Sequence, residues 1–195
     1  MNNTLPHTAA KSAPGFRRIS HAWARRAVGL VLLVTMSAAF AQSDDDFYEE
    51  SKPWEELAVH LPAPPQSGNL LSFYVSPTAT LKFSVDAKSV SVGSDGVVRY
   101  TLVAVSPQGA RNVSYEGIRC ATFEHKIYAT GNDDGTWAPL QQPQWMPIRR
   151  GNANRERAAL AQGYFCENLT VAGKADDIVR RLKSGHTLTD DLLSE

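Results

Sequence analysis

Residues 92–106, "VGSDGVVRYTLVAVS", decide the fold, because two runs rich in β-branched residues flank a short turn sequence. Within that turn, Ser94-Asp95-Gly96 ends in an Asp-Gly pair, which can occupy the φ > 0 positions of a tight hairpin. Just upstream, residues 80–86, "TLKFSVD", alternate apolar and polar side chains with the period of two that is typical of a half-buried strand. The region therefore predicts a hairpin preceded by a further strand.

The next strand, "NVSYEGIRC", contains two apolar sets of opposite parity. Val113 and Tyr115 share one face of a regular strand, whereas Ile118 and Cys120 belong to the other. Because Gly117 lies between the two sets, we expect a β-bulge there that shifts the phase and turns all four side chains inward. In the strand after it, alternate positions 123, 125, 127 and 129 share one face, and the chain reads as an antiparallel meander.

Helix signals come only late in the chain. Asn152 or Asn154 can cap the segment "RERAALAQGYF", on which Leu160 and Tyr164 lie one turn apart. A second helix is expected over Asp176–Ser184, with acidic residues in its first turn, basic residues near its end and a glycine as the stop. The predicted fold class is α+β, with a small antiparallel β-sheet followed by one or two helices.

The first 41 residues are typical of a signal for export. They contain five basic residues and no acidic one, and the apolar run at 27–40 is too short to span a bilayer. Small residues at Ala39 and Ala41 suit a signal peptidase, which predicts a mature start at Gln42. We expect a cleavable, Sec-type signal peptide over 1–41 and a periplasmic or extracellular protein with no transmembrane segment in the mature chain. A retained anchor or an organelle presequence is the alternative.

Cleavage leaves an acidic chain. Removing five of 20 basic residues and none of 20 acidic ones leaves 15 against 20, a net charge of −5 over 154 residues. Because nucleic acid binds to a positive face, we expect no nucleic-acid partner. The mature chain divides into an acidic and then proline-rich leader or strap at 42–69, an α+β domain at 70–171, and a C-terminal helix with a flexible tail at 172–195. Trp54 of the strap is expected to dock onto its own domain.

The two cysteines favour a structural bridge. Cys120 ends a predicted strand, Cys166 follows a predicted helix, and an exported protein meets an oxidising compartment, so we predict a Cys120–Cys166 disulfide. A redox-active pair is the alternative, but such pairs usually sit two residues apart. A thiol nucleophile with His125 as its base would leave Cys166 unpaired.

Catalytic, metal and cofactor signals are weak. Glu124 and Lys126 lie on the strand face opposite His125, so we interpret this histidine as a half-buried sheet residue. The histidines lack the spacing of zinc ligands, and "NDDG" at 132–135 supports a turn rather than a calcium loop. The sequence contains no phosphate-binding, dinucleotide-binding or hydrolase motif. We therefore predict no catalytic residue, no metal and no cofactor.

One cluster of aromatic and basic residues is a stronger candidate for a functional site. Trp137, Trp145, Arg149 and Arg150, with Arg155 and Arg157 nearby, can form a ligand surface, because arginine forks pair well with carboxylates and phosphates. The alternative is a solvated loop and helix start that pairs with the protein's own acidic leader.

Several segments, in the same order, resemble the CNP1-like family of uncharacterised secreted proteobacterial proteins. They are "LLSFYVSP", "SVGSDGVVRYTLV", "NVSYEGIRC", "KIYATGNDDGTW" and "GYFC", and the resemblance covers about residues 45 to 170. It implies an envelope or periplasmic protein and supplies no catalytic residue. Family members include lipid-anchored proteins, but this chain has no cysteine at its cleavage site.

The resulting hypothesis is a non-catalytic binding or envelope-associated interaction domain, whose partner is an envelope component or another protein. The alternative is a periplasmic hydrolase or thiol oxidoreductase. A deep pocket that brings His125 near Asp133, Glu124 or Tyr128 would favour the enzyme, and a shallow aromatic and basic face would favour binding.

Overall fold

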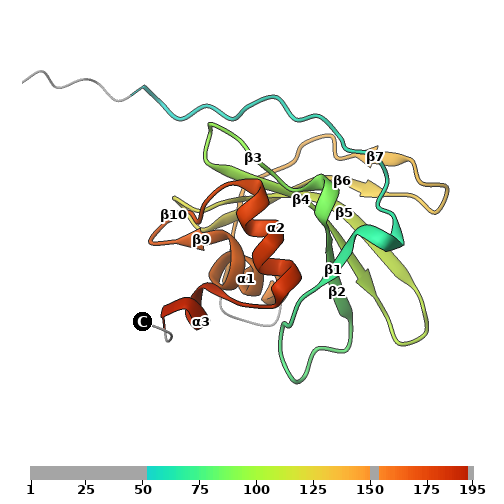
Figure 1. Ribbon diagram of the computed structural model, residues 1–195. Helices are drawn as coiled ribbons and strands as arrows, with labels where there is room; N and C mark the ends of the chain where they lie inside the picture. Colours follow the sequence, from blue (N-terminus) through green and yellow to red (C-terminus); the bar gives the residue numbers. More distant parts are fainter. Residues whose placement is uncertain (1–51, 150–153, 193–195) are drawn as a thin grey trace, which may run out of the picture. The chain divides into compact units, whose positions relative to one another are not determined.

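The computed structural model of the protein describes residues 52–149 and 154–192 (Figure 1). The expected signal peptide and the start of the acidic leader lie outside these residues. The strands are β1 (Leu70–Ser72), β2 (Lys82–Asp86), β3 (Ser91–Val92), β4 (Val97–Val105), β5 (Arg111–Arg119), β6 (Glu124–Gly131), β7 (Trp137–Pro139), β8 (Met146–Pro147), β9 (Cys166–Glu167) and β10 (Thr170–Val171). The helices are α1 (Arg155–Leu160), α2 (Ala175–Ser184) and α3 (Leu188–Leu192), with a π-helical segment at Ala161–Phe165 and 3-10 turns at Ser67–Asn69 and Ala87–Ser89.

Eight of the described strands form one antiparallel sheet. Its order is β1-β2-β4-β5-β6-β7, while β3 pairs with the end of β4 that β2 leaves free and β8 pairs with the start of β6. From β4 to β7, neighbours in sequence are neighbours in the sheet, as in a meander. Helices follow the sheet in the chain, so the predicted α+β class is confirmed.

The predicted hairpin joins β3 to β4. The N–H of Gly93 donates to the Val97 carbonyl oxygen at 3.1 Å, and the N–H of Gly96 donates to the Gly93 oxygen at 3.0 Å. Gly96 has φ of +73°, whereas Asp95 keeps a negative φ and instead accepts a bond from the Val97 N–H. Of the Asp-Gly pair, only the glycine therefore takes the left-handed conformation.

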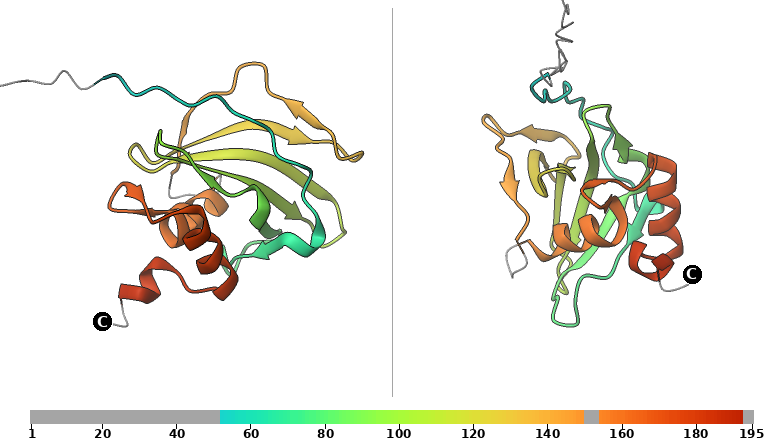
Figure 2. Two further views of the ribbon diagram at one scale, coloured as in Figure 1. Left: turned by 45° about the horizontal axis from the view of Figure 1, so that its top comes forward. Right: turned by 90° about the vertical axis from the view of Figure 1, so that its left-hand side faces the viewer.

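Strand β4 is buried on both faces from Val97 to Ala104, because the sheet is covered on both sides. One side, here called the helix face, packs against the helices (Figure 2). It carries alternate residues of β4 and their pairing partners, and its core includes Val98, Tyr100, Leu102, Ile118, Cys120, Leu160, Phe165 and Ile178. The other side, here called the strap face, carries Arg99, Tyr115, Tyr128 and Trp137.

The expected bulge at Gly117 was wrong in its position. Strand β5 pairs with β4 without a break from Arg111 to Arg119, so Tyr115 lies on the strap face and Ile118 on the helix face. The irregularity lies one pair away on β6, where Tyr128 is the extra residue. Gly117 is needed for space, because an added Cβ would collide with the Tyr128 hydroxyl. The apolar residues of both parities are covered, because the helices pack on one face of the sheet and the strap crosses the other (Figure 2).

The first helical segment begins at Arg155, as the sequence predicts, with Asn154 at the cap position. The Asn154 side chain makes no capping bond, however, and α1 changes into the π-helical segment after Leu160. Leu160 and Tyr164 are both buried, as their spacing suggests. Helix α2 closely matches the predicted range and ends at Gly185, whose φ is +72°.

Helix α3 and the β9–β10 hairpin were not predicted. Thr187 and Asp190 exchange bonds at the start of α3, the Asp190 carboxylate accepting from the Thr187 N–H at 2.8 Å. This capping pair is visible in the sequence, inside the segment expected to be a flexible tail. The β9–β10 turn places both Asn168 and Leu169 at positive φ, which a leucine rarely adopts, so its sequence gives little warning.

The strap, defined here as residues 52–66, has no regular secondary structure and crosses the strap face of the sheet (Figure 2). The Trp54 indole N–H donates to the Asp95 carbonyl oxygen at 2.8 Å, and the Arg119 guanidinium lies 3.7 Å from the Trp54 ring centre. Docking of Trp54 onto its own domain is therefore confirmed.

Candidate functional site

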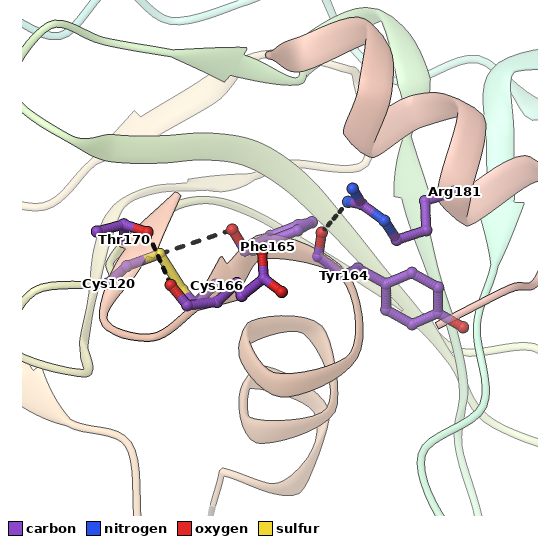
Figure 3. The surroundings of a disulfide bond; sticks show 7 residues. Cys120, Tyr164, Phe165, Cys166, Thr170 and Arg181 are labelled. Atoms are coloured by element: carbon purple, nitrogen blue, oxygen red, sulfur yellow. Dashed lines mark hydrogen bonds between the residues drawn. A yellow bond between two sulfur atoms is a disulfide. The ribbon is translucent and has the colours of Figure 1, made fainter. Parts of the chain in front are cut away.

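The predicted disulfide is present. Cys120 follows the end of β5 and Cys166 begins β9, and their sulfur atoms are joined with Cα atoms 5.4 Å apart (Figure 3). Nearby, the Arg181 guanidinium donates to the carbonyl oxygens of Tyr164 and Ala172 at 2.6 and 3.2 Å. Because Cys120 is almost fully buried, the bridge fastens the helical layer to the sheet beneath the surface.

The four residues of the predicted ligand surface differ in what they contact and in whether the structure describes them. The Trp137 indole N–H donates to the Pro62 carbonyl oxygen at 2.8 Å, and that of Trp145 donates to the Glu56 carboxylate at 3.3 Å. Arg149 is exposed, and Arg150 lies outside the described residues. The indole N–H of each tryptophan thus donates a hydrogen bond to the strap of the same chain. A ligand role for these residues stays a prediction.

The centre of the strap contact is Glu56. Its carboxylate accepts bonds from Lys126 and Tyr128, both at 2.7 Å. Partial burial acts to raise the pKa of Glu56, but these bonds outweigh it and hold the pKa below its ordinary value. Burial and the bond to Glu56 raise the pKa of Tyr128 far above its usual range, so its hydroxyl keeps its proton.

A second polar network lies on the helix face, where apolar residues dominate. Glu116 is fully buried. The Arg157 guanidinium donates two hydrogen bonds to its carboxylate, from Nε at 2.8 Å and from a terminal nitrogen at 2.7 Å. Tyr100 and Ser114 donate their hydroxyl groups to the same carboxylate at 3.1 and 2.5 Å. Four donors therefore satisfy both oxygens of a buried charge.

Arg157 connects this network to the surface. It reaches Glu116 from α1, and its remaining terminal nitrogen donates to Glu156 at 2.6 Å. Burial acts to lower the pKa of Arg157, but the bonds to Glu116 outweigh it, so the guanidinium stays charged. Burial and the nearby Glu116 charge raise the pKa of Tyr100 well above its usual value.

His125 lies on the same face, because it pairs with Ile118 in the adjacent strand. It is buried rather than half-buried, and neither ring nitrogen has a hydrogen-bond partner among the described residues. Burial and the neighbouring Arg157 charge lower its pKa, while Glu116 opposes the shift. The ring is therefore neutral at pH 7.

The residues that would have marked an enzyme pocket around His125 do not gather there. Tyr128 lies on the strap face, Asp133 belongs to the exposed turn after β6, and the Glu124 carboxylate accepts a bond from Thr122. Within residues 52–149 and 154–192, no group of three or more histidine, cysteine and acidic side chains is placed to hold a metal ion.

A cleft of about 540 Å³ opens on the helix face, at the end of the sheet where β5 begins. Helix α1 forms one wall with Glu156 and Arg157, and the sheet forms the floor. The floor and rim residues are Leu81, Phe83, Leu102, Ala104, Arg111, Asn112, Val113, Ser114, Thr130, Gly131, Asn132 and Asp133. The Glu116–Arg157 pair therefore lies beside the cleft and fixes the position of its charged wall.

The pairing of Glu116 with Arg157 was not predicted. One signal was available, because Glu116 shares its strand parity with Ile118 and Cys120. A carboxylate on an apolar strand face must have a buried partner. The partner itself lies 41 positions along the chain, on a helix whose packing the sequence does not reveal.

The profile of the CNP1-like family matches residues 49–183, which is more than half of the chain. The chain belongs to the CNP1-like family. Among curated proteins it is similar to "Cryptic neisserial protein 1" of Neisseria gonorrhoeae, with 28% identity over 82% of this chain and 92% of that protein. No solved structure matches the chain. The match to the family includes the strap, both cysteines and the cleft.

The helices of the described regions are all too short or too polar to cross a membrane.

Proposed function

We propose that this CNP1-like protein is exported to the periplasm and acts there as a non-catalytic binding domain, whose ligand enters the cleft beside Arg157. Export is supported by the leader, with its basic start, short apolar run and small residues before Gln42. The Cys120–Cys166 disulfide also fits an oxidising compartment.

The observation that carries the binding proposal is the buried Glu116–Arg157 pair beside the cleft. Burying two charges gives little net stability, and apolar residues of similar volume often do as well. A protein that retains such a pair gains a fixed arrangement of polar groups, here at the wall of a cleft of about 540 Å³. The strap face offers less, because the strap already engages its aromatic and charged groups.

The chemistry of the network favours binding over catalysis. Both oxygens of Glu116 accept hydrogen bonds from the protein, and Arg157 keeps its charge, so the pair presents no unengaged base to a substrate. Cys120 and His125 are buried, which denies a substrate access to their reactive atoms. A hydrolase with His125 as its base, or a thiol nucleophile at Cys120, needs those atoms exposed to its substrate. Cys166 is half-buried, but its sulfur is bonded to Cys120.

Intact-mass spectrometry of the protein from the periplasm tests export. The proposal expects a chain that starts at Gln42, and one that gains two hydrogens on reduction. An uncut leader would overturn the assignment of the compartment.

Amide chemical-shift mapping tests binding without assuming a ligand. The ¹⁵N-labelled protein receives a low-molecular-weight filtrate of periplasm, and we expect shifts to cluster at Ser114, Thr130 and their neighbours. Thr130→Trp, which fills the cleft, should abolish them. Gln142→Trp places the same side chain on an exposed loop and should preserve them. Shifts confined to the strap and Trp145 would move the binding surface to the other face.

A further inference from the structure

The lining of the cleft points to the class of ligand, and this inference rests on the function proposed above. We propose that the cleft binds an uncharged, polyhydroxylated molecule, a saccharide ring or a short glycan. Three features of the lining carry the inference: balanced charge, side chains that both donate and accept hydrogen bonds, and an apolar floor.

The charged groups of the cleft cancel. Arg111 and Arg157 contribute two positive charges, and Asp133 and Glu156 contribute two negative ones, so the lining has no net charge. An anionic or cationic ligand would therefore lose water from its charge without meeting an excess of the opposite sign. A neutral ligand avoids that cost.

The two arginines are engaged to different degrees, Arg157 by two carboxylates and the exposed Arg111 by one carbonyl oxygen. Arg157 donates to Glu116 and Glu156, and Arg111 donates to the Pro65 carbonyl oxygen at 3.3 Å. An arginine that recognises a phosphate or carboxylate presents its planar fork to the ligand. The Arg157 fork is instead turned toward Glu116, so its role is to hold the wall in place.

The remaining polar groups suit hydroxyl groups. Asn112, Ser114, Thr130 and Asn132 line the cleft, and amide and hydroxyl side chains can each donate and accept. A sugar hydroxyl has the same double capacity, so contacts with Asn112 and Thr130 can form in either direction. Ser114 already donates to Glu116 and can accept from a ligand. Thr130 and Asn112 are exposed, which leaves their polar atoms within reach of a ligand.

The apolar floor suits the carbon face of a sugar ring. Leu81 and Phe83 are half-buried, and both line the cleft with the buried Leu102. Contact with the C–H groups of a ring would remove this surface from water. The volume of about 540 Å³ lies within the range of about 300–1,000 Å³ that is usual for small-molecule sites.

Calorimetric titration of the protein from the periplasm tests the inference. The neutral probes are triacetylchitotriose and maltotriose, each with its monosaccharide, N-acetylglucosamine and glucose. The charged probes are inorganic phosphate, triglutamate and spermidine. We expect at least one neutral saccharide to bind, Thr130→Trp to weaken it at least about tenfold, and Gln142→Trp to leave it unchanged. Binding by trisaccharides alone identifies a glycan chain, and equal binding by monosaccharides identifies a free sugar.

Two results would overturn the inference and leave the proposed binding function standing. One is binding in the cleft by phosphate, triglutamate or spermidine with no response to any saccharide. The other is no response to any of these probes from a protein whose cleft amides do respond to the periplasmic filtrate. Loss of the filtrate response as well would remove both proposals.

Discussion

The two faces of the sheet are covered by different means. On the helix face, apolar side chains from β2, β4 and β5 pack against α1, α2 and the π-helical segment, and one disulfide fastens the layers. On the strap face, an extended segment without helix or strand is held by hydrogen bonds and aromatic contacts with charged side chains. Apolar packing therefore supplies most of the stability on one face, and polar contacts position the strap on the other.

This difference predicts that changes on the helix face cost more stability than changes on the strap face. It also separates roles, because the helix face leaves a cleft open at one end while the strap crosses the opposite side (Figure 2). The following substitutions test the comparison, in order of expected effect.

Arg157→Met should have the largest effect. It leaves the fully buried Glu116 charge without its partner, which costs about 3–5 kcal/mol of unfolding free energy. Denaturant unfolding measures the loss. Arg155→Met is the matched control, since the hydrogen bonds of Arg155 among the described residues go to the hydroxyl groups of Ser76 and Thr78. If the two variants lose the same small amount of unfolding free energy, the buried pair stabilises the helix face no more than the contacts of Arg155 do.

Replacing both Cys120 and Cys166 by alanine should be nearly as costly. A cross-link with a sequence separation of 46 constrains the unfolded chain by about 4 kcal/mol in the chain-entropy account. Thermal and denaturant unfolding of the oxidised protein and of the variant measure the difference. An unchanged midpoint would show that apolar packing alone holds the helical layer on the sheet.

Gly117→Ala should have an intermediate effect, since it acts between the sheet and the strap. The added methyl group displaces the Tyr128 hydroxyl from its place beside Glu56, which we expect to cost about 1–3 kcal/mol. Gly68→Ala is the control, because an added Cβ there meets no atom within 4 Å. Equal stability of the two variants would show that Tyr128 has room to move.

Glu56→Gln should have the smallest effect, no more than about 1 kcal/mol, because the Glu56 contacts lie near the surface. The folded-state pKa of Glu56 is lowered, so its contribution is present above the unfolded-state pKa and is lost as pH falls through the folded-state value. The gap between wild type and variant should therefore shrink on acidification from pH 7. A gap in stability that grows on acidification would contradict a lowered folded-state pKa of Glu56. Glu55→Gln, at an exposed neighbour, is the control.

Local patterns predicted the elements that depend on local chemistry. The Gly96 turn, the alternation in β2 and the α2 stop at Gly185 all follow from a few adjacent residues. The disulfide followed from the positions of Cys120 and Cys166 relative to predicted elements.

What the sequence did not reveal depends on contacts between distant residues. The strap reaches Tyr128 across 72 positions, and Arg157 reaches Glu116 across 41. No local periodicity encodes such a pair. The misplaced bulge has the same origin, because Gly117 was interpreted as a break in its own strand when it makes room for a side chain from the next one.

The most direct test of the central claim is to replace the buried pair by apolar residues and measure binding and stability together. The variant combines Glu116→Leu with Arg157→Met, which removes both charges of the buried pair and leaves Glu156, partly exposed, as the remaining charge of that wall. The account predicts that it unfolds within about 1–2 kcal/mol of wild type, yet loses the filtrate-induced amide shifts at Thr130 and Asn112. Shifts of wild-type size in a stable double variant would contradict the account, because the pair would then be part of the core and have no role in the cleft.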